Sequence, residues 1–196
     1  MLYAFGFERV GVLVSDLYFV DPAPHKGQEG AEHGVRLELR VLERGALKGS
    51  IYSAQPIEVG QPIWRADFLE SAAGRPGSFD RTHHHPVFGG WEPNSRVFVR
   101  ELSADPLGWL SGKLADLAEL VASAGFPSDA IGPDDAESLR SVAPEIVDAT
   151  RRLLEKVQSG ELGRPPRDEA LAGAGAGPGA SGPAAAEPVS IRAGWL

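Results

Sequence analysis

Hydrophobic side chains recur at every second position through much of the first hundred residues of this chain, which is the spacing that buries one face of a β-strand. The pattern is clearest between residues 35 and 44, where apolar and charged positions alternate. The apolar set is Val35, Leu37, Leu39 and Val41, and the charged set is Arg36, Glu38 and Arg40. We therefore predict a half-buried strand here, with its charged side chains on the outer face.

Other runs rich in β-branched and aromatic residues predict further strands at 7–14, 17–20, 50–59, 62–69 and 96–102. Segments rich in glycine, proline and polar residues separate these runs and predict loops or turns at 21–34, 44–49 and 71–78. Because the turn at 44–49 is short, the strands on either side of it should pair as a hairpin.

Beyond residue 104 the hydrophobic spacing changes to three and four, which is typical of a helix with one apolar stripe. Asp105 and Pro106 suit the start of such a helix, and Gly125 suits its end. We predict one helix over 105–125 and a second helical segment over 134–159. Pro144 should kink the second segment or divide it in two.

These elements predict an α+β fold with one domain over residues 1–160. A mainly antiparallel sheet or small open barrel over 1–102 would be covered on one side by the helices of 105–159. Residues 161–196 are predicted to form a disordered tail rich in alanine, glycine and proline, because 172–186 hold no large apolar side chain that would offset the entropy of ordering. Trp195 and Leu196 end this tail and could dock on a partner.

Composition excludes several kinds of function. The chain has no cysteine, so disulfides, thiolate metal sites and thiol nucleophiles are absent. Its net charge is −8, the acidic residues concentrate in 101–160, and no basic stripe exists, so nucleic acid is not an expected partner. We see neither a secretory leader nor an apolar run near the roughly 20 residues that span a bilayer, and we predict a cytoplasmic protein with no membrane partner. Arginine far outnumbers lysine, which indicates a GC-rich bacterial genome.

Candidate chemistry is concentrated in residues 80–86, which hold three of the five histidines. If this run is extended, His83 and His85 project from one face and His84 from the other. Two imidazoles at this spacing can bind one divalent transition metal such as zinc, iron, manganese or nickel. We predict Glu92 as the third ligand, and the alternatives that stay open are Glu32, Glu29, His33 and His25.

The same segment allows two further interpretations. Arg75, Arg81 and Arg96, together with the histidines, could form a pocket for a phosphate or carboxylate anion. Alternatively, the histidines belong to an ordinary hydrogen-bonded loop that binds no ligand.

The sequence therefore predicts a small bacterial protein with a histidine-centred pocket for a metal or a small ligand, and it assigns no reaction. The alternative is a non-enzymatic interaction or accessory protein, in which the acidic helical face and the C-terminal tail bind a protein partner.

Overall fold

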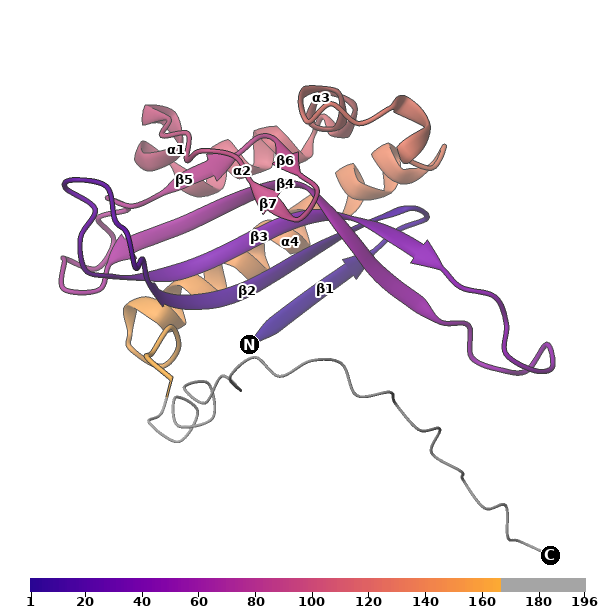
Figure 1. Ribbon diagram of the computed structural model, residues 1–196, viewed down its shortest axis with the longest axis horizontal. Helices are drawn as coiled ribbons and strands as arrows, with labels where there is room; N and C mark the ends of the chain where they lie inside the picture. The colour runs from indigo at the N-terminus through magenta and orange to yellow at the C-terminus, as the bar shows by residue number, and fades with distance from the viewer. Residues whose placement is uncertain (167–196) are drawn as a thin grey trace, which may run out of the picture. The chain divides into compact units, whose positions relative to one another are not determined.

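The strands of this protein form an open sheet in which each strand pairs with the next one along the chain. The computed structural model describes residues 1–166 (Figure 1). All pairs in the five-stranded sheet are antiparallel, and the order is β1-β2-β3-β4-β5. The strands are β1 (Leu2–Gly6), β2 (Val10–Val20), β3 (Ala31–Arg44), β4 (Ile57–Ser71) and β5 (His83–His85). The sheet does not close, so the open-sheet form of the prediction is confirmed and a barrel is not formed.

Helices follow the sheet in the chain. They are α1 (Arg100–Ala104), α2 (Pro106–Leu114), α3 (Leu117–Ser123), the short 3-10 turn η1 (Ser128–Ala130) and α4 (Asp135–Gln158). A small separate hairpin, β6 (Phe88–Gly89) and β7 (Glu92–Pro93), lies between the sheet and the helices in the sequence. Figure 1 shows α4 running behind β2 and β3, against which it packs. The predicted α+β class is confirmed.

The strand register gives the sheet one apolar and one polar face. Leu39 lies between Val12 and Trp64 on its two neighbouring strands, and Val35 lies opposite Phe68. All five side chains are buried in the core that the sheet shares with the helices. The predicted alternation at 35–44 is therefore confirmed, and the charged side chains of β3 lie on the face away from this core.

The predicted strands at 7–14 and 17–20 and the predicted loop at 21–34 have different bounds in the structure. Residues 7–9 form the turn between β1 and β2, and β2 continues through the polar pair Ser15 and Asp16 because β3 pairs with it along its whole length. Residues 31–34 belong to β3 although they are glycine-containing and polar. Gly34 is needed there, since an added Cβ would lie 2.0 Å from the Phe68 carbonyl oxygen.

The segments predicted as strands at 50–59 and 62–69 also differ. Residues 57–71 form one strand, β4, which contains Pro62 at an irregularity in its pairing with β3, where a missing N–H is tolerated. The predicted strand at 96–102 is wrong. Only Val97 bridges to β5, at His84, and the chain then turns into α1.

The predicted helix at 105–125 begins and ends as expected but is interrupted. The Asp105 carboxylate caps α2 by accepting the Gly108 N–H, and Asp116 caps α3 in the same way through the Glu119 N–H. Gly125 follows α3 with a φ of 77°, as the prediction of a glycine end requires. Pro144 lies inside α4 without dividing it.

None of the helices within residues 1–166 is both long enough and apolar enough to cross a membrane. The tail prediction falls mostly on residues 167–196, which lie outside the described residues.

Candidate metal centre

The polar face of the sheet carries a row of charged side chains where β3, β4 and β5 meet. Arg36 of β3 lies opposite Asp67 of β4, and Asp67 in turn lies opposite His83 of β5. Arg65 lies opposite His85. Because side chains alternate along a strand, all of these groups share one face.

His84 lies on the other face of β5, as the alternation predicts. Its ring packs near Trp64 and Trp109, with ring centroids 6.3 and 5.2 Å away. It therefore belongs to the helix-covered side of the sheet and not to the polar cluster.

Three ligating atoms converge on the polar face. The Nε2 atoms of His83 and His85 are 3.1 Å apart, and they lie 3.4 and 3.6 Å from Oδ2 of Asp67. The three residues are buried, with exposed fractions of 1% for His83, 4% for His85 and 0% for Asp67. Such a buried group of two imidazoles and one carboxylate can hold a metal ion.

The hydrogen bonds of the two rings determine which nitrogen is available. Nδ1 of His83 lies 2.7 Å from the Arg81 carbonyl oxygen, and Nδ1 of His85 lies 2.6 Å from the Asn94 carbonyl oxygen. A carbonyl oxygen only accepts, so each Nδ1 must donate its proton. In the neutral ring Nε2 is then a bare lone pair, which is the arrangement that metal-ligating histidines use.

The distances between these atoms suit a four-coordinate ion. With Zn–N and Zn–O bonds of about 2.0–2.2 Å, tetrahedral ligand atoms lie about 3.3–3.5 Å apart. The observed separations of 3.1, 3.4 and 3.6 Å bracket this value. Shifts of a few tenths of an ångström would seat an ion, and a coordination position would remain open beside the three protein ligands.

Arg36 holds the carboxylate of Asp67 in place. Its Nε and Nη2 atoms donate to Oδ1 and Oδ2 at 2.7 and 3.2 Å, a two-point contact that fixes the orientation of the carboxylate. Burial by itself would raise the pKa of Asp67, but the adjacent His83 and His85 side chains and the charge and hydrogen bonds of Arg36 outweigh it and hold this pKa well below its usual range. Asp67 is therefore an ionised carboxylate.

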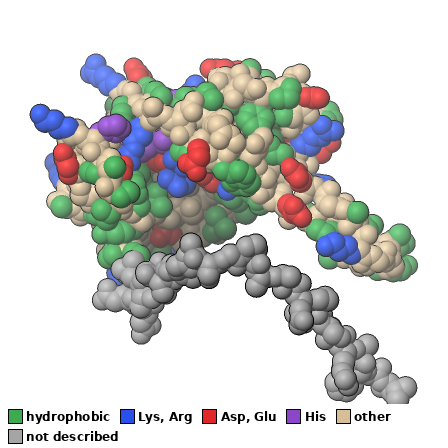
Figure 2. All heavy atoms as spheres, in the orientation of Figure 1, with side chains coloured by type: hydrophobic (Ala, Val, Ile, Leu, Met, Phe, Trp, Pro, Cys, Tyr) green, Lys and Arg blue, Asp and Glu red, His purple; other side chains and the backbone are tan. Residues whose placement is uncertain are grey.

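An open cavity of about 400 Å³ borders the cluster. Its charged lining side chains are Asp21, Asp67, Arg36, Arg65 and Arg96. The three guanidinium groups are close enough to affect one another: burial lowers the pKa of Arg65 although Asp67 raises it, and Arg36 and Arg96 lower it further. Figure 2 shows histidine side chains at the surface of the molecule among basic and acidic ones.

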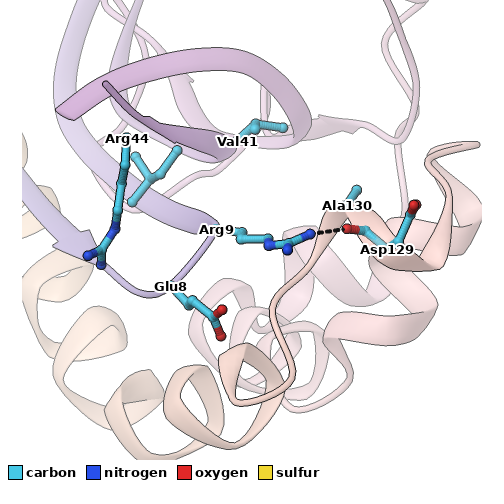
Figure 3. A pocket seen from close by; sticks show the side chains of 7 residues that line it. Glu8, Arg9, Val41, Arg44, Asp129 and Ala130 are labelled. Atoms are coloured by element: carbon cyan, nitrogen blue, oxygen red, sulfur yellow. Dashed lines mark hydrogen bonds between the residues drawn. The ribbon is translucent and has the colours of Figure 1, made fainter. Parts of the chain in front are cut away.

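A second cavity, of about 540 Å³, lies near the turn between β1 and β2 (Figure 3). There the Arg9 side chain donates to the Asp129 carbonyl oxygen at 2.7 Å. Within the described residues, no group of three metal-ligating side chains lies in this second cavity. The cavity beside Asp67 is therefore the one where chemistry is concentrated.

The structure brings together some of the residues predicted from the sequence and leaves others apart. His83 and His85 meet, but Glu92 is exposed on β7 and does not join them. Of the alternatives for the third ligand, Glu32 is buried against Arg96, and His25 lines the cavity. Glu29 and His33 are also outside the group of ligating atoms.

The predicted anion-binding arginines are likewise separated. Arg96 lines the cavity, whereas Arg75 is exposed in the loop after β4 and does not line it. Arg81 donates to the Gly27 carbonyl oxygen and pairs with Asp80. The other two arginines that line the cavity are Arg36 of β3 and Arg65 of β4.

The sequence analysis did not identify Asp67 as a member of this cluster. A signal was present, because Asp67 is a single acidic residue between the apolar Ala66 and Phe68, in the middle of a predicted strand. A carboxylate in that position must face away from the core or have buried partners.

Comparison with protein-family models, with curated proteins and with solved structures found no match for this chain.

Proposed function

We propose that this protein binds a divalent transition metal ion through Asp67, His83 and His85, and that the bound ion is the working centre of the adjoining cavity. One observation carries the proposal. The Nδ1–H groups of both histidines donate to backbone carbonyl oxygens, so in the neutral rings two bare Nε2 atoms face each other and the Asp67 carboxylate inside the protein.

Without a cation between them, these three atoms would repel one another. Each offers a lone pair, and burial removes the water that would otherwise donate to it. A proton on one ring relieves the contact between two of the atoms, whereas a metal ion satisfies all three. The arrangement is therefore better suited to a metal than to a hydrogen-bond network.

The donor set favours metals of intermediate softness. Two imidazole nitrogens and one carboxylate oxygen suit zinc, iron(II), manganese and nickel. Three protein ligands leave room on the metal for water or a substrate, which is the ligand number of hydrolytic zinc and non-haem iron(II) centres. A bound ion of this kind polarises a substrate oxygen or activates a water molecule.

The alternative function, an accessory protein that works through an acidic helical face, has less support. Asp148 and Glu155 of α4 are paired with Arg151, and Asp148 also pairs with Arg152. These pairs neutralise part of the charge that a basic partner would need.

Metal analysis of the purified protein tests the proposal. After expression in medium supplemented with each metal in turn, the protein should carry stoichiometric zinc, iron, manganese or nickel. His83→Ala and His85→Ala should abolish this binding, because two ligands from the protein do not make a stable site. His84→Phe is the matched control, since His84 faces the core, and it should keep the metal.

The pH dependence of binding provides a second readout. Protonation of Nε2 competes with the metal for the same lone pair, so affinity should fall as the solution is made acidic. Absence of bound metal in every preparation, with no thermal shift on adding any of the four ions, would refute the metal centre. Circular dichroism of the two alanine variants separates loss of the site from loss of the fold.

A further inference from the structure

We propose that the cavity beside the metal centre binds a small oxyanion, a carboxylate or phosphate group, one oxygen of which coordinates the metal while Arg65 and Arg96 hold the others. This inference rests on the proposed function, because the metal supplies one of the contacts. It goes beyond it by naming the chemical class of the ligand.

Arg65 has donor capacity that the protein does not use. Its Nε atom is enclosed beside Asp67 and, within the described residues, has no hydrogen-bond partner, so the donors that a ligand in the cavity would meet are those of the two Nη atoms. The Nε atom lies 3.1 Å from Oδ2 of Asp67, but the two groups are not aligned for a hydrogen bond. Its Nη1 atom is 4.0 Å from Glu38, which is beyond hydrogen-bond distance. The Phe88 ring, 5.7 Å from the guanidinium carbon, holds this group beside the cavity.

Arg96 is anchored along one edge and available along the other. Its Nη1 atom donates to buried Glu32 at 2.8 Å and to Gln28 at 3.1 Å. Its Nη2 atom is 3.9 Å from Asp21, too far for a hydrogen bond. A guanidinium carries five N–H donors in a rigid fork, so an anchored arginine of this kind can still bind an oxyanion at two points.

The charge balance of the cluster makes anion binding depend on the metal. Four guanidinium groups, those of Arg36, Arg40, Arg65 and Arg96, are paired with four carboxylates in or behind the cavity wall. The carboxylates are Asp21, Glu32, Glu38 and Asp67. These charges balance one another, and a divalent cation makes the cluster positive, so the anion should bind after the metal and not before it.

The size of the cavity limits the ligand. Its volume of about 400 Å³ is near the lower end of the range for small-molecule sites. A small carboxylic acid or a phosphate fits this space, whereas a polymer would need a longer groove.

The test uses the full-length protein loaded with Co²⁺, whose visible absorption changes when a ligand enters its coordination shell. Inorganic phosphate and glycolate are titrated separately, and calorimetry gives each dissociation constant. We expect a saturable spectral change with at least one of the two anions. The anion with the lower dissociation constant identifies the class of ligand, phosphate or carboxylate. The metal-free protein should bind the same anion at least about tenfold more weakly.

Three variants make the assignment specific. Arg65→Gln should weaken anion binding roughly ten- to a hundredfold, the range expected for removing a charge-assisted hydrogen bond. Arg96→Lys keeps a charge beside Glu32 but loses the fork, and it should also weaken binding. Arg75→Gln removes the same charge as Arg65→Gln from an exposed loop, so it should bind the anion like the original protein.

Failure of this inference is distinguishable from failure of the metal centre. Stoichiometric Co²⁺ with no spectral response to either anion, or with a response that Arg65→Gln and Arg96→Lys leave unchanged, would overturn the oxyanion site and leave the metal centre standing. Absence of bound Co²⁺ before any anion is added would overturn both. If Arg65→Gln loses its metal, Arg96→Lys carries the test, because Arg96 does not touch Asp67, His83 or His85.

Discussion

Three neighbouring histidines in β5 have different chemistry because their ring nitrogens have different partners. Backbone carbonyl groups fix the rings of His83 and His85 and leave Nε2 free for a metal. His84 has no such contact, and its Nδ1 atom is buried without a hydrogen-bond partner among the described residues. A residue type repeated three times thus has two roles, set by the side of the strand.

The environment of His84 makes the stability of the metal-free protein depend on pH. Burial, the charge of Lys113 and the neighbouring imidazoles of His85 and His83 lower the pKa of His84 from its ordinary value of 6.5 to about 4. The unfolded chain takes up a proton on this ring as pH falls through 6.5, whereas the folded protein does so only near 4. The free energy of unfolding should therefore decrease as pH falls across this window.

Replacing His84 by phenylalanine should remove this contribution. Urea unfolding of the metal-free protein, followed between neutral pH and pH 4, should show a smaller loss of stability for His84→Phe than for the original chain. Other groups titrate in the same range, so the difference between the two proteins is the quantity to compare. Parallel stability curves would mean that His84 does not contribute.

Among the secondary-structure elements, the start of α4 is tied to the turn between β1 and β2 by one buried carboxylate. Asp135 accepts hydrogen bonds from the backbone N–H groups of Glu8 at 2.7 Å, Arg9 at 3.2 Å and Gly132 at 2.7 Å. The Asp135 side chain therefore accepts hydrogen bonds both from the β1–β2 turn and from the segment that precedes α4. This role could not be predicted from the sequence, because acidic residues at helix starts are common and usually exposed.

Asp135→Ala should destabilise the protein by about 3 kcal/mol or more, since it leaves several backbone donors without partners. Asp135→Asn keeps one acceptor oxygen and should lose less. The neighbouring Asp134→Ala is the control, because Asp134 is exposed and its side chain makes no capping hydrogen bond. Chemical denaturation measures all three, and equal stability of the two alanine variants would contradict the role of Asp135.

For the molecule as a whole, the two faces of the sheet divide structure from chemistry. The apolar face packs on the helices, and the polar face holds the cluster of Asp67, His83 and His85 and its cavity. The β3–β4 hairpin extends beyond the rest of the sheet (Figure 1), and its far end exposes Ile51 and Tyr52. The apolar side chains of the core come from the face of the sheet that the helices cover.

Deleting residues 165–196 should leave the melting temperature unchanged within error. The buried apolar side chains of the core lie between residues 10 and 157, and the contact of the Gly163 N–H with Asp16 would be kept. Thermal unfolding of the truncated and full-length proteins measures this. A clear decrease on truncation would show that the C-terminal segment stabilises the folded part.

Local rules of sequence were enough for the features that depend on near neighbours. Alternation placed Val35, Leu37 and Leu39 in the core and put His83 and His85 on one face. Capping chemistry located the helix start at Asp105 and the end at Gly125. Each of these features is set by side-chain spacing or backbone conformation within a few residues.

The positions of Asp67 and of the cavity arginines relative to the histidines are set by the pairing between strands. Asp67 meets the histidines because β4 pairs with β5 in one particular register, and Arg36 reaches Asp67 because β3 pairs with β4. A shift of one residue would have turned Asp67 toward the core. Register is chosen by the burial of whole apolar faces against the helices, so it is a property of the folded chain, and no short segment reveals it.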